Sequence, residues 1–256
     1  MPHFTGISHL LLDIEGTTCP VTFVADTLFP YAATHLAGFL QEQGNNPAVQ
    51  RLVLEAETAW QSDADPEARA LREQTQSAAG DSAGAKRRLT TQVSAYLQLL
   101  IRQDRKLTAL KDLQGLIWEA GYANGELVAP LYDDVPAALT RWQAAGVQLA
   151  VYSSGSVPAQ QLLYGHTQSG NLRPLFSHWF DTRTGAKHLA DSYSTISQTM
   201  RVHPHQVLFI SDALAECEAA HQAGMAVLFS DRPGNPQRNP STFGKISDYS
   251  ELVITP

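Results

Sequence analysis

Four short apolar runs, rich in Val, Ile, Leu and Phe, predict buried strands. Runs of this composition fit strands whose two faces are both covered, as in a parallel sheet. Apolar positions at helical spacing over 135–145 and 214–223 predict two helices, which end at Gly146 and Gly224. Strand and helix therefore alternate, and the pattern predicts an α/β protein with a doubly wound parallel sheet. The four runs cover residues 10–12, 147–152, 207–210 and 226–229.

The interval from about 21 to 127 has a different pattern. Its apolar residues recur at helical spacing, as over 49–60 and 93–101, and no run within it is typical of a strand. The small and polar residues 77–84 predict a loop inside this helical block. The sequence therefore predicts an all-helical insertion after the first strand, and it shows no internal repeat.

Composition is ordinary for a globular protein, with 43% hydrophobic and 17% charged residues in a chain of 256. The net charge of −7, from 18 basic and 25 acidic residues, argues against nucleic acid as a partner. The densest basic run, at 86–88, is interpreted as part of a solvated face. Cys19 and Cys217 suggest neither a disulfide scaffold nor a zinc site, and Cys19 is interpreted as a small buried hydrophobe.

The N-terminus lacks the basic and apolar regions of a signal peptide, and no run approaches the ~20 apolar residues of a membrane helix. We therefore expect a cytoplasmic protein with no membrane partner, and we expect it to be a monomer.

Three of the predicted strands are followed by side chains that can do chemistry, namely Asp13, Ser153 and Asp212. Ligands of open α/β sheets bind at the carboxyl ends of the strands, so these residues would converge in one crevice. Each of them alone could be an ordinary turn residue or helix N-cap. Their joint occurrence favours a functional site.

Asp13 and Glu15 are separated by one residue, so they point the same way while the chain is extended. Gly16 then permits a turn and the close approach of an anion to backbone N–H groups. Two acids at a phosphate site make sense only with a cation, and Asp13 and Asp212 supply the hard oxygen ligands that Mg²⁺ prefers. The sequence therefore predicts a magnesium-dependent phosphohydrolase whose nucleophile is Asp13.

The other oxygens of a phosphoryl group need donors. Ser153 and the amides after it can supply some, and Lys187 is placed between strand units where it could supply a positive charge. A surface lysine is the alternative for Lys187. The residues around it do not match the P-loop pattern.

These features, in this order, resemble those of the haloacid-dehalogenase-like phosphatases. Glu15, where that superfamily generally has a second Asp, points to the enolase-phosphatase (acireductone synthase) branch. The resemblance covers almost the whole chain. It is carried by DIEGTTCP at 13–20, YSSGS at 152–156, YGHT at 164–167, FDTRTG at 180–185 and RPGNP at 232–236.

The resemblance implies an α/β core over 1–20 and 128–256 and a helical cap domain over 21–127. It implies that Asp13 forms an aspartyl-phosphate and that Glu15 acts as general acid/base, for which the pKa of Glu15 must be raised. Binding of phosphate would fall to Ser153, Ser154 and Lys187, and binding of one Mg²⁺ per chain to Asp13, Glu15 and Asp212. The implied substrate is a small phosphorylated molecule, 2,3-diketo-5-methylthiopentyl-1-phosphate of methionine salvage, which is enolised and dephosphorylated to the acireductone.

Two departures from the family pattern are Cys217-Glu218, where the family usually has Leu-Asp, and Asn171, where Asp is more frequent. Neither falls on a proposed catalytic group, and Glu216 is retained. Two alternatives remain open: another magnesium-dependent phosphatase or phosphotransferase of the same superfamily, and a non-catalytic phosphate-binding protein. The base of the enolisation could be Glu15, a cap residue or a water.

Overall fold

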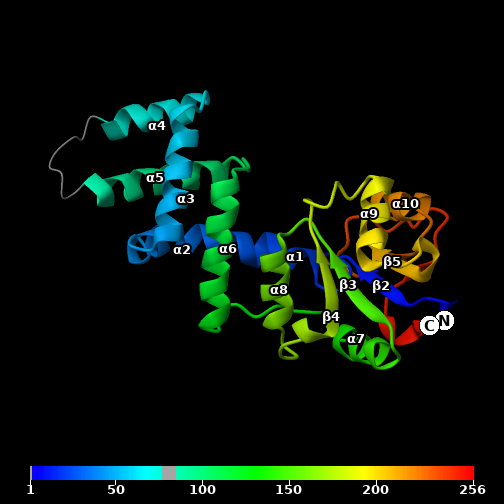
Figure 1. Ribbon diagram of the computed structural model, residues 1–256. Coiled ribbons are helices and arrows are strands. Elements are labelled where there is room, and N and C mark those ends of the chain that lie inside the picture. The colour runs from blue at the N-terminus through cyan, green and yellow to red at the C-terminus, as the bar shows by residue number, and fades with distance from the viewer. Residues whose placement is uncertain (1, 77–84) are drawn as a thin grey trace. The chain divides into compact units, whose positions relative to one another are not determined.

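The computed structural model describes residues 2–76 and 85–256. The loop expected at 77–84 and the side chains of the basic run at 86–88 lie outside the described part. The chain divides into two compact units, one formed by Met1–Ala25 with Gly125–Pro256 and the other by Asp26–Asn124. The first is an α/β unit and the second is helical (Figure 1).

A six-stranded parallel sheet forms the centre of the α/β unit, with strand order β4-β3-β2-β5-β6-β7. The central strands contain the predicted apolar runs, and β5 is buried at every position. The strands are β2 (His9–Leu12), β3 (Gln148–Tyr152), β4 (Phe176–Phe180), β5 (Val207–Ser211), β6 (Ala226–Ser230) and β7 (Lys245–Ile246). The predicted doubly wound parallel sheet is confirmed.

The strand order reverses at β2, whose neighbours are β3 on one side and β5 on the other. Such a reversal creates a crevice at the carboxyl ends of the strands. Leu12 pairs in register with both Val151 and Ile210, so the residues that follow β2, β3 and β5 emerge at the same level. The fold thereby brings together the chain positions expected to carry chemistry.

Four helices connect these strands, namely α7 (Val135–Ala144), α8 (Val157–Gly165), α9 (Ala190–Met200) and α10 (Leu214–Gln222). Helices α9 and α10 pack on one face of the sheet, where Tyr193 and Ile196 join Phe209 in a buried core. Helix α7 packs against β3 and against the 3₁₀ turn Tyr249–Glu251. The predicted helix ends at Gly146 and Gly224 are confirmed, since both glycines have positive φ directly after the helix caps.

Four of the described strands, the two-residue β7 among them, were not predicted as such. A short parallel pair joins β1 (His3–Thr5) to β8 (Val253–Thr255), so the two ends of the chain lie side by side (Figure 1). The insertion therefore follows the first strand of the main sheet, which is the second strand of the chain. Strand β4 is at the sheet edge, and Ser177 and His178 interrupt its apolar pattern, which explains why no strand was predicted there.

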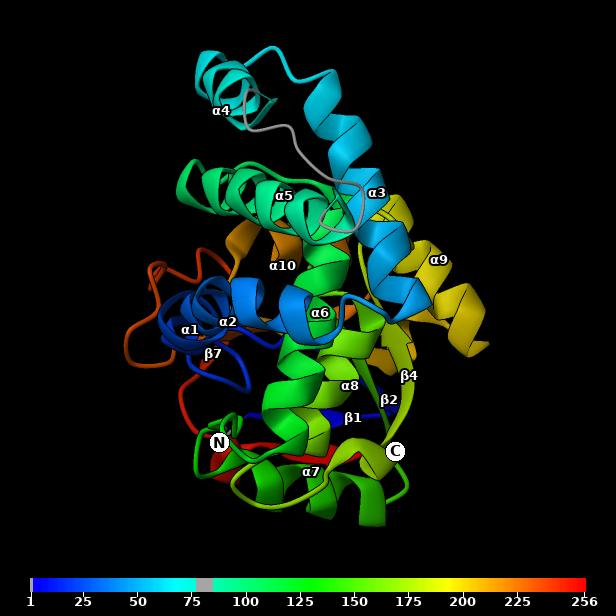
Figure 2. The ribbon, with the colours of Figure 1, turned by 90° about the vertical axis from the view of Figure 1, so that its left-hand side faces the viewer.

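The helical unit contains long amphipathic helices, whose buried residues include Leu36, Leu40, Leu52 and Trp60. Helix α2 packs against α5 and α6, and α3 packs against α6 (Figure 2). A short α1 (Val21–Phe23) and a π-helical turn (Val24–Leu28) precede them. The helices are α2 (Phe29–Glu42), α3 (Pro47–Gln61), α4 (Pro66–Gln76), α5 (Ala85–Arg102) and α6 (Thr108–Ala123).

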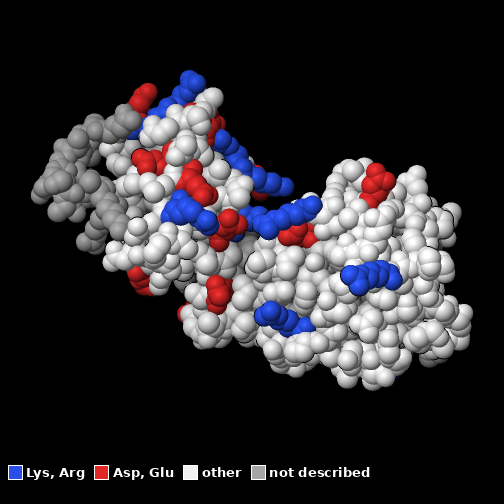
Figure 3. Space-filling view, viewed as in Figure 1, with Lys and Arg blue, Asp and Glu red and all other residues white. Residues whose placement is uncertain are grey.

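Acidic and basic side chains are interspersed on the face of the helical unit drawn in Figure 3. A part-buried network in this unit links the turn after α3 to α5 and the residues that follow it: Asp63 accepts hydrogen bonds from Arg105 at 2.7 Å and from the Tyr96 hydroxyl at 2.9 Å. No helix in residues 2–76 and 85–256 is long and apolar enough to span a membrane.

Candidate active site

Asp13 follows β2 and opens a tight turn. The carbonyl of Ile14 accepts hydrogen bonds from the amides of Thr17, Thr18 and Cys19, at 2.9 to 3.2 Å, which folds residues 14–19 back on themselves. Gly16 has a φ of +65°, a conformation that an L side chain rarely adopts. The turn leaves the carboxylate of Asp13 largely buried, at 6% exposure, at the carboxyl end of the sheet.

Lys187 contacts the candidate nucleophile directly. Its Nζ lies 2.7 Å from Asp13 Oδ1 and 2.7 Å from Glu216 Oε2. Burial alone would lower the pKa of Lys187, but the charges of Asp13 and Glu216 outweigh it, and the pKa lies above its ordinary value. Lys187 is therefore a fixed positive charge at the strand ends rather than a surface lysine.

Three side-chain hydroxyl groups hold the loop that carries Lys187, because each donates a hydrogen bond to one of the loop's main-chain carbonyls. Tyr152 donates to the carbonyl of Gly185 at 2.9 Å, Ser192 to that of Ala186 at 2.8 Å, and Tyr193 to that of Lys187 itself at 2.7 Å. These three anchors were not expected from the sequence. They hold the main chain around Lys187 in place independently of the ion pairs of its side chain.

Asp212 follows β5 and lies beside the turn at Gly16. A Cβ placed on Gly16 would come within 2.2 Å of Asp212 Oδ2, so only glycine allows this approach. Burial, followed by the negative charge of Asp13, raises the pKa of Asp212 to about 7, against the opposing effect of Lys187.

Glu216, in the first turn of α10, is a site residue that the sequence analysis did not assign. Besides its ion pair with Lys187, its carboxylate accepts a hydrogen bond from the Ser211 hydroxyl at 2.9 Å. Burial and the charge of Asp13 raise the pKa of Glu216 to about 7. Its position four residues after Asp212, in the first turn of the helix that follows, was the available signal.

The donor set fits a hard divalent cation. Lys187 pairs with Asp13 and Glu216, and the carboxylate of Asp212 lies beside Gly16 of the same turn, so three acidic side chains gather at the strand ends around one lysine. Within the described residues no three His, Cys, Asp or Glu side chains form a complete ligand set. Mg²⁺ tolerates such a sparse set, because it keeps waters and takes phosphate oxygens as its remaining ligands.

Ser153 and Ser154 follow β3, the neighbour of β2. Ser153 is buried, its amide donates to the carbonyl of Phe180 at 3.2 Å, and its hydroxyl accepts from the amide of Gly155 at 3.2 Å. Ser154 is exposed on the same turn. Their place at the strand ends agrees with phosphate binding, which remains a prediction.

Glu15 is half-buried on the turn after Asp13. Burial, followed by the charge of Asp13, raises the pKa of Glu15, while Lys187 acts in the opposite direction. This is the direction that a general acid near neutral pH requires. Cys19, on the same turn, is fully buried, and burial raises the pKa of its thiol to about 12, so it is a neutral packing group.

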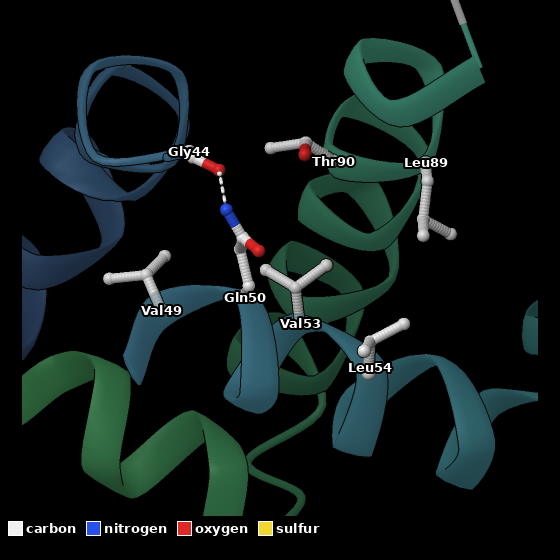
Figure 4. A pocket seen from close by; sticks show the side chains of 7 residues that line it. All are labelled: Gly44, Val49, Gln50, Val53, Leu54, Leu89 and Thr90. Atoms are coloured by element: carbon white, nitrogen blue, oxygen red, sulfur yellow. Dashed lines mark hydrogen bonds between the residues drawn. The ribbon is translucent and has the colours of Figure 1, made fainter. Parts of the chain in front are cut away.

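A separate pocket lies within the helical unit and contains none of the residues expected to carry chemistry. Figure 4 shows the amide of Gln50 donating to the carbonyl of Gly44 at 3.0 Å, beside apolar side chains of α3 and Leu89 of α5. No titratable side chain lines it.

The parallel sheet and the strand-end carboxylates define a haloacid dehalogenase-like hydrolase, and the model of that family matches residues 7–224. A structure of the Saccharomyces cerevisiae UTR4 protein is 31% identical in sequence and superposes with a TM-score of 0.70. The match covers 96% of this chain and 100% of that protein. *Rhodobacter sphaeroides* CbbY, at 19% identity and a TM-score of 0.53 with 97% of each chain covered, shows the same fold.

Within this class the chain belongs to the enolase-phosphatase E1 family. It is 49% identical to the enolase-phosphatase E1 of *Prochlorococcus marinus* (strain MIT 9313), with 94% of this chain and 96% of that protein covered. It is 46% identical to that of *Synechococcus elongatus*, with 98% and 100% covered. The family expected from the sequence motifs is confirmed, and the chain is a hydrolytic enzyme.

Proposed function

We propose that this chain is a Mg²⁺-dependent enolase-phosphatase that converts 2,3-diketo-5-methylthiopentyl-1-phosphate to the acireductone and phosphate. The observation that carries the proposal is the strand-end cluster, in which Asp13 lies 2.7 Å from Lys187 and beside two acids with raised pKa values. Family membership supports the choice of reaction. In this reading the helical unit serves as the cap.

In the phosphatase step Asp13 attacks phosphorus and the bond to the leaving oxygen breaks, which gives an aspartyl-phosphate. Glu15, whose raised pKa keeps a proton available, protonates the leaving oxygen and then takes a proton from the water that hydrolyses the intermediate. Lys187, with Ser153 and Ser154, holds the phosphoryl oxygens.

The side chains of Asp13 and Asp212 would hold the magnesium ion together with Glu15, which could contribute either its side chain or its main-chain carbonyl; only the carbonyl leaves the carboxyl group free to act as the acid. Bound there, it would neutralise charge on the phosphoryl group and on the carboxylates. The enolisation removes a proton from a carbon next to a carbonyl. Glu15, a residue of the helical unit or a water could accept that proton.

The test uses the purified full chain with Mg²⁺ and the diketone phosphate, following ultraviolet absorbance for the enol and free phosphate in parallel. We expect both signals from the native chain and loss of phosphate release in Asp13→Asn. Asp231→Asn is a matched control, because Asp231 also follows a strand but pairs with Lys245 and Arg238. Phosphate release from unrelated sugar phosphates but not from this compound would refute the proposed substrate, and full activity of Asp13→Asn would refute the mechanism.

A further inference from the structure

Asn235 lies in the loop after β6. Its side-chain amide holds the turn at residues 13–19, which carries Asp13 and Glu15 and is called the catalytic turn below. Its Nδ2 donates to the carbonyl of Gly16 at 2.8 Å and to the carbonyl of Ser230 at 3.1 Å. The side chain is buried, with 6% of the residue exposed. Asn235 thus contacts the turn that carries Asp13 and Glu15 without belonging to it in sequence.

These two bonds fix which way the amide faces. Both partners are main-chain carbonyls, which only accept hydrogen bonds, so the nitrogen must be on their side and the oxygen on the other. The oxygen, Oδ1, faces the gap beside Gly16, where a Cβ would lie 2.7 Å from it and 2.2 Å from Asp212 Oδ2. Asn235 Oδ1 and Asp212 Oδ2 therefore border the same small space.

An amide oxygen and an ionised carboxylate both only accept hydrogen bonds, and no described residue donates to Asn235 Oδ1 although it is buried. A buried acceptor without a donor is costly, and two acceptors facing one space do not satisfy each other. A hydrated cation in this space would supply the missing donor, because water held by Mg²⁺ directs its hydrogens away from the ion.

We propose that Asn235 is a positioning residue of the magnesium site, whose Oδ1 accepts a hydrogen bond from a water bound to the divalent cation next to Asp212. The inference rests on the proposed function. The amide group anchors the side chain on Gly16 and Ser230, and the oxygen orients the outer part of the ion's shell. Partners of this kind change metal affinity by about 10- to 100-fold when they are removed.

A purely structural role must be separated from this one, because Asn235 also clamps Gly16. Ser230 provides the control, since its hydroxyl donates to the same Gly16 carbonyl at 2.8 Å. Ser230→Ala removes a clamp on Gly16 and leaves Asn235 Oδ1 in place. Asn235→Ala removes both the clamp and the oxygen, and Asn235→Asp keeps an acceptor oxygen while it loses the amide donors.

The experiment measures Mn²⁺ binding to the full chain by electron paramagnetic resonance, without substrate. We expect the Kd to rise about 10- to 100-fold in Asn235→Ala, to stay within about threefold in Ser230→Ala, and to return to the native range or below in Asn235→Asp. Native affinity in Asn235→Ala, or Asn235→Asp binding as weakly as Asn235→Ala, would overturn the proposal. If Asn235→Ala does not fold, the Mn²⁺ affinities of Asn235→Asp and Ser230→Ala decide. If Asn235 served only to hold Gly16 through its amide, Asn235→Asp would bind Mn²⁺ more weakly than the native chain.

Failure of the proposed function gives a different result. In that case the native chain releases no phosphate from the diketone phosphate, whether or not it binds Mn²⁺. A native chain that binds Mn²⁺ and is active, with unchanged affinity in Asn235→Ala, refutes the role of Asn235 alone.

Discussion

Replacing Lys187 with methionine would remove the charge that the strand-end carboxylates share, while keeping a side chain of similar length. The three side chains are buried, with exposures of 11% for Lys187, 8% for Asp13 and 17% for Glu216. Removing one partner of a buried ion pair costs about 3–5 kcal/mol, because the other charge stays buried without compensation. In a chain of this length that loss lowers the thermal midpoint by roughly 10 °C.

The assay is urea and thermal unfolding in metal-free buffer at pH 8, which lies above the raised pKa of Glu216. Lys245→Met is the matched control, because Lys245 forms an ion pair of 2.9 Å with Asp231 but is 56% exposed. Exposed pairs contribute about 0–1 kcal/mol, so the control should change stability little. The cost in Lys187→Met should shrink at pH 5, where protonation of Glu216 removes the uncompensated charge.

A double variant tests the cause of the loss. Glu216→Gln added to Lys187→Met replaces the unpaired carboxylate by a neutral amide that can still accept the hydrogen bond from Ser211. The double variant should therefore be more stable than Lys187→Met alone, which gives a coupling energy between the two sites. Equal losses in Lys187→Met and Lys245→Met, or no gain in the double variant, would show that Lys187 does not balance buried charge.

Three further results are expected. Gly16→Ala places a Cβ 2.2 Å from Asp212 Oδ2 at a φ of +65°, so Mn²⁺ affinity and phosphate release should both be lost, and native values of both would contradict this geometry. The pKa values of Asp212 and Glu216 are raised to about 7 in the folded metal-free chain, so that state binds more protons than the unfolded chain below pH 7. The thermal midpoint in EDTA should therefore fall as pH rises from 5 to 8, and saturating Mg²⁺ should suppress the fall; a flat curve in EDTA would argue against the shifts. Glu15→Gln should slow phosphate release about 10²- to 10⁴-fold and remove one limb of the pH–rate profile, and a profile identical to the native one would exclude Glu15 as the acid.

The central part of the fold was predictable because its signals are local. Strands β2, β3, β5 and β6 are buried and apolar throughout most of their length, and Gly146 and Gly224 end helices by their positive φ. Edge elements gave weaker signals. Strand β4 is buried only at its first and last residues, and β7 pairs through two residues.

The candidate site was predictable where its residues directly follow strands. Asp13, Ser153 and Asp212 were found in this way, and Lys187 was found through its position between strand units and the family resemblance. Glu216 was not assigned, because its role depends on which face of α10 meets the lysine. Such pairings between distant elements depend on side-chain geometry that no local pattern encodes.

The anchoring of the catalytic turn was likewise beyond the reach of sequence patterns. Ser230 and Asn235 bind the carbonyl of Gly16, and the hydroxyl of Tyr249 donates to the carbonyl of Thr17 at 3.0 Å. The accepting carbonyls are more than 200 residues away along the chain. Every residue has a main-chain carbonyl, so the type of residue at positions 16 and 17 does not reveal these contacts. The RPGNP motif at 232–236 was recognised by resemblance, but its physical reason appears only in three dimensions.

The hydrogen bonds to the carbonyls of Gly16 and Thr17 hold the turn in a way that does not depend on the charge of Asp13, whereas the ion pair with Lys187 does. In the proposed reaction the carboxylate of Asp13 becomes part of a covalent phosphate and then an anion again, so its attraction to Lys187 changes within each cycle. A turn held mainly by that attraction would shift whenever the charge changed. Neutral hydrogen bonds from Ser230, Asn235 and Tyr249 to carbonyls are unaffected by the state of Asp13. The C-terminal segment therefore fixes the position of the nucleophile, and the charges around it remain free to serve the chemistry.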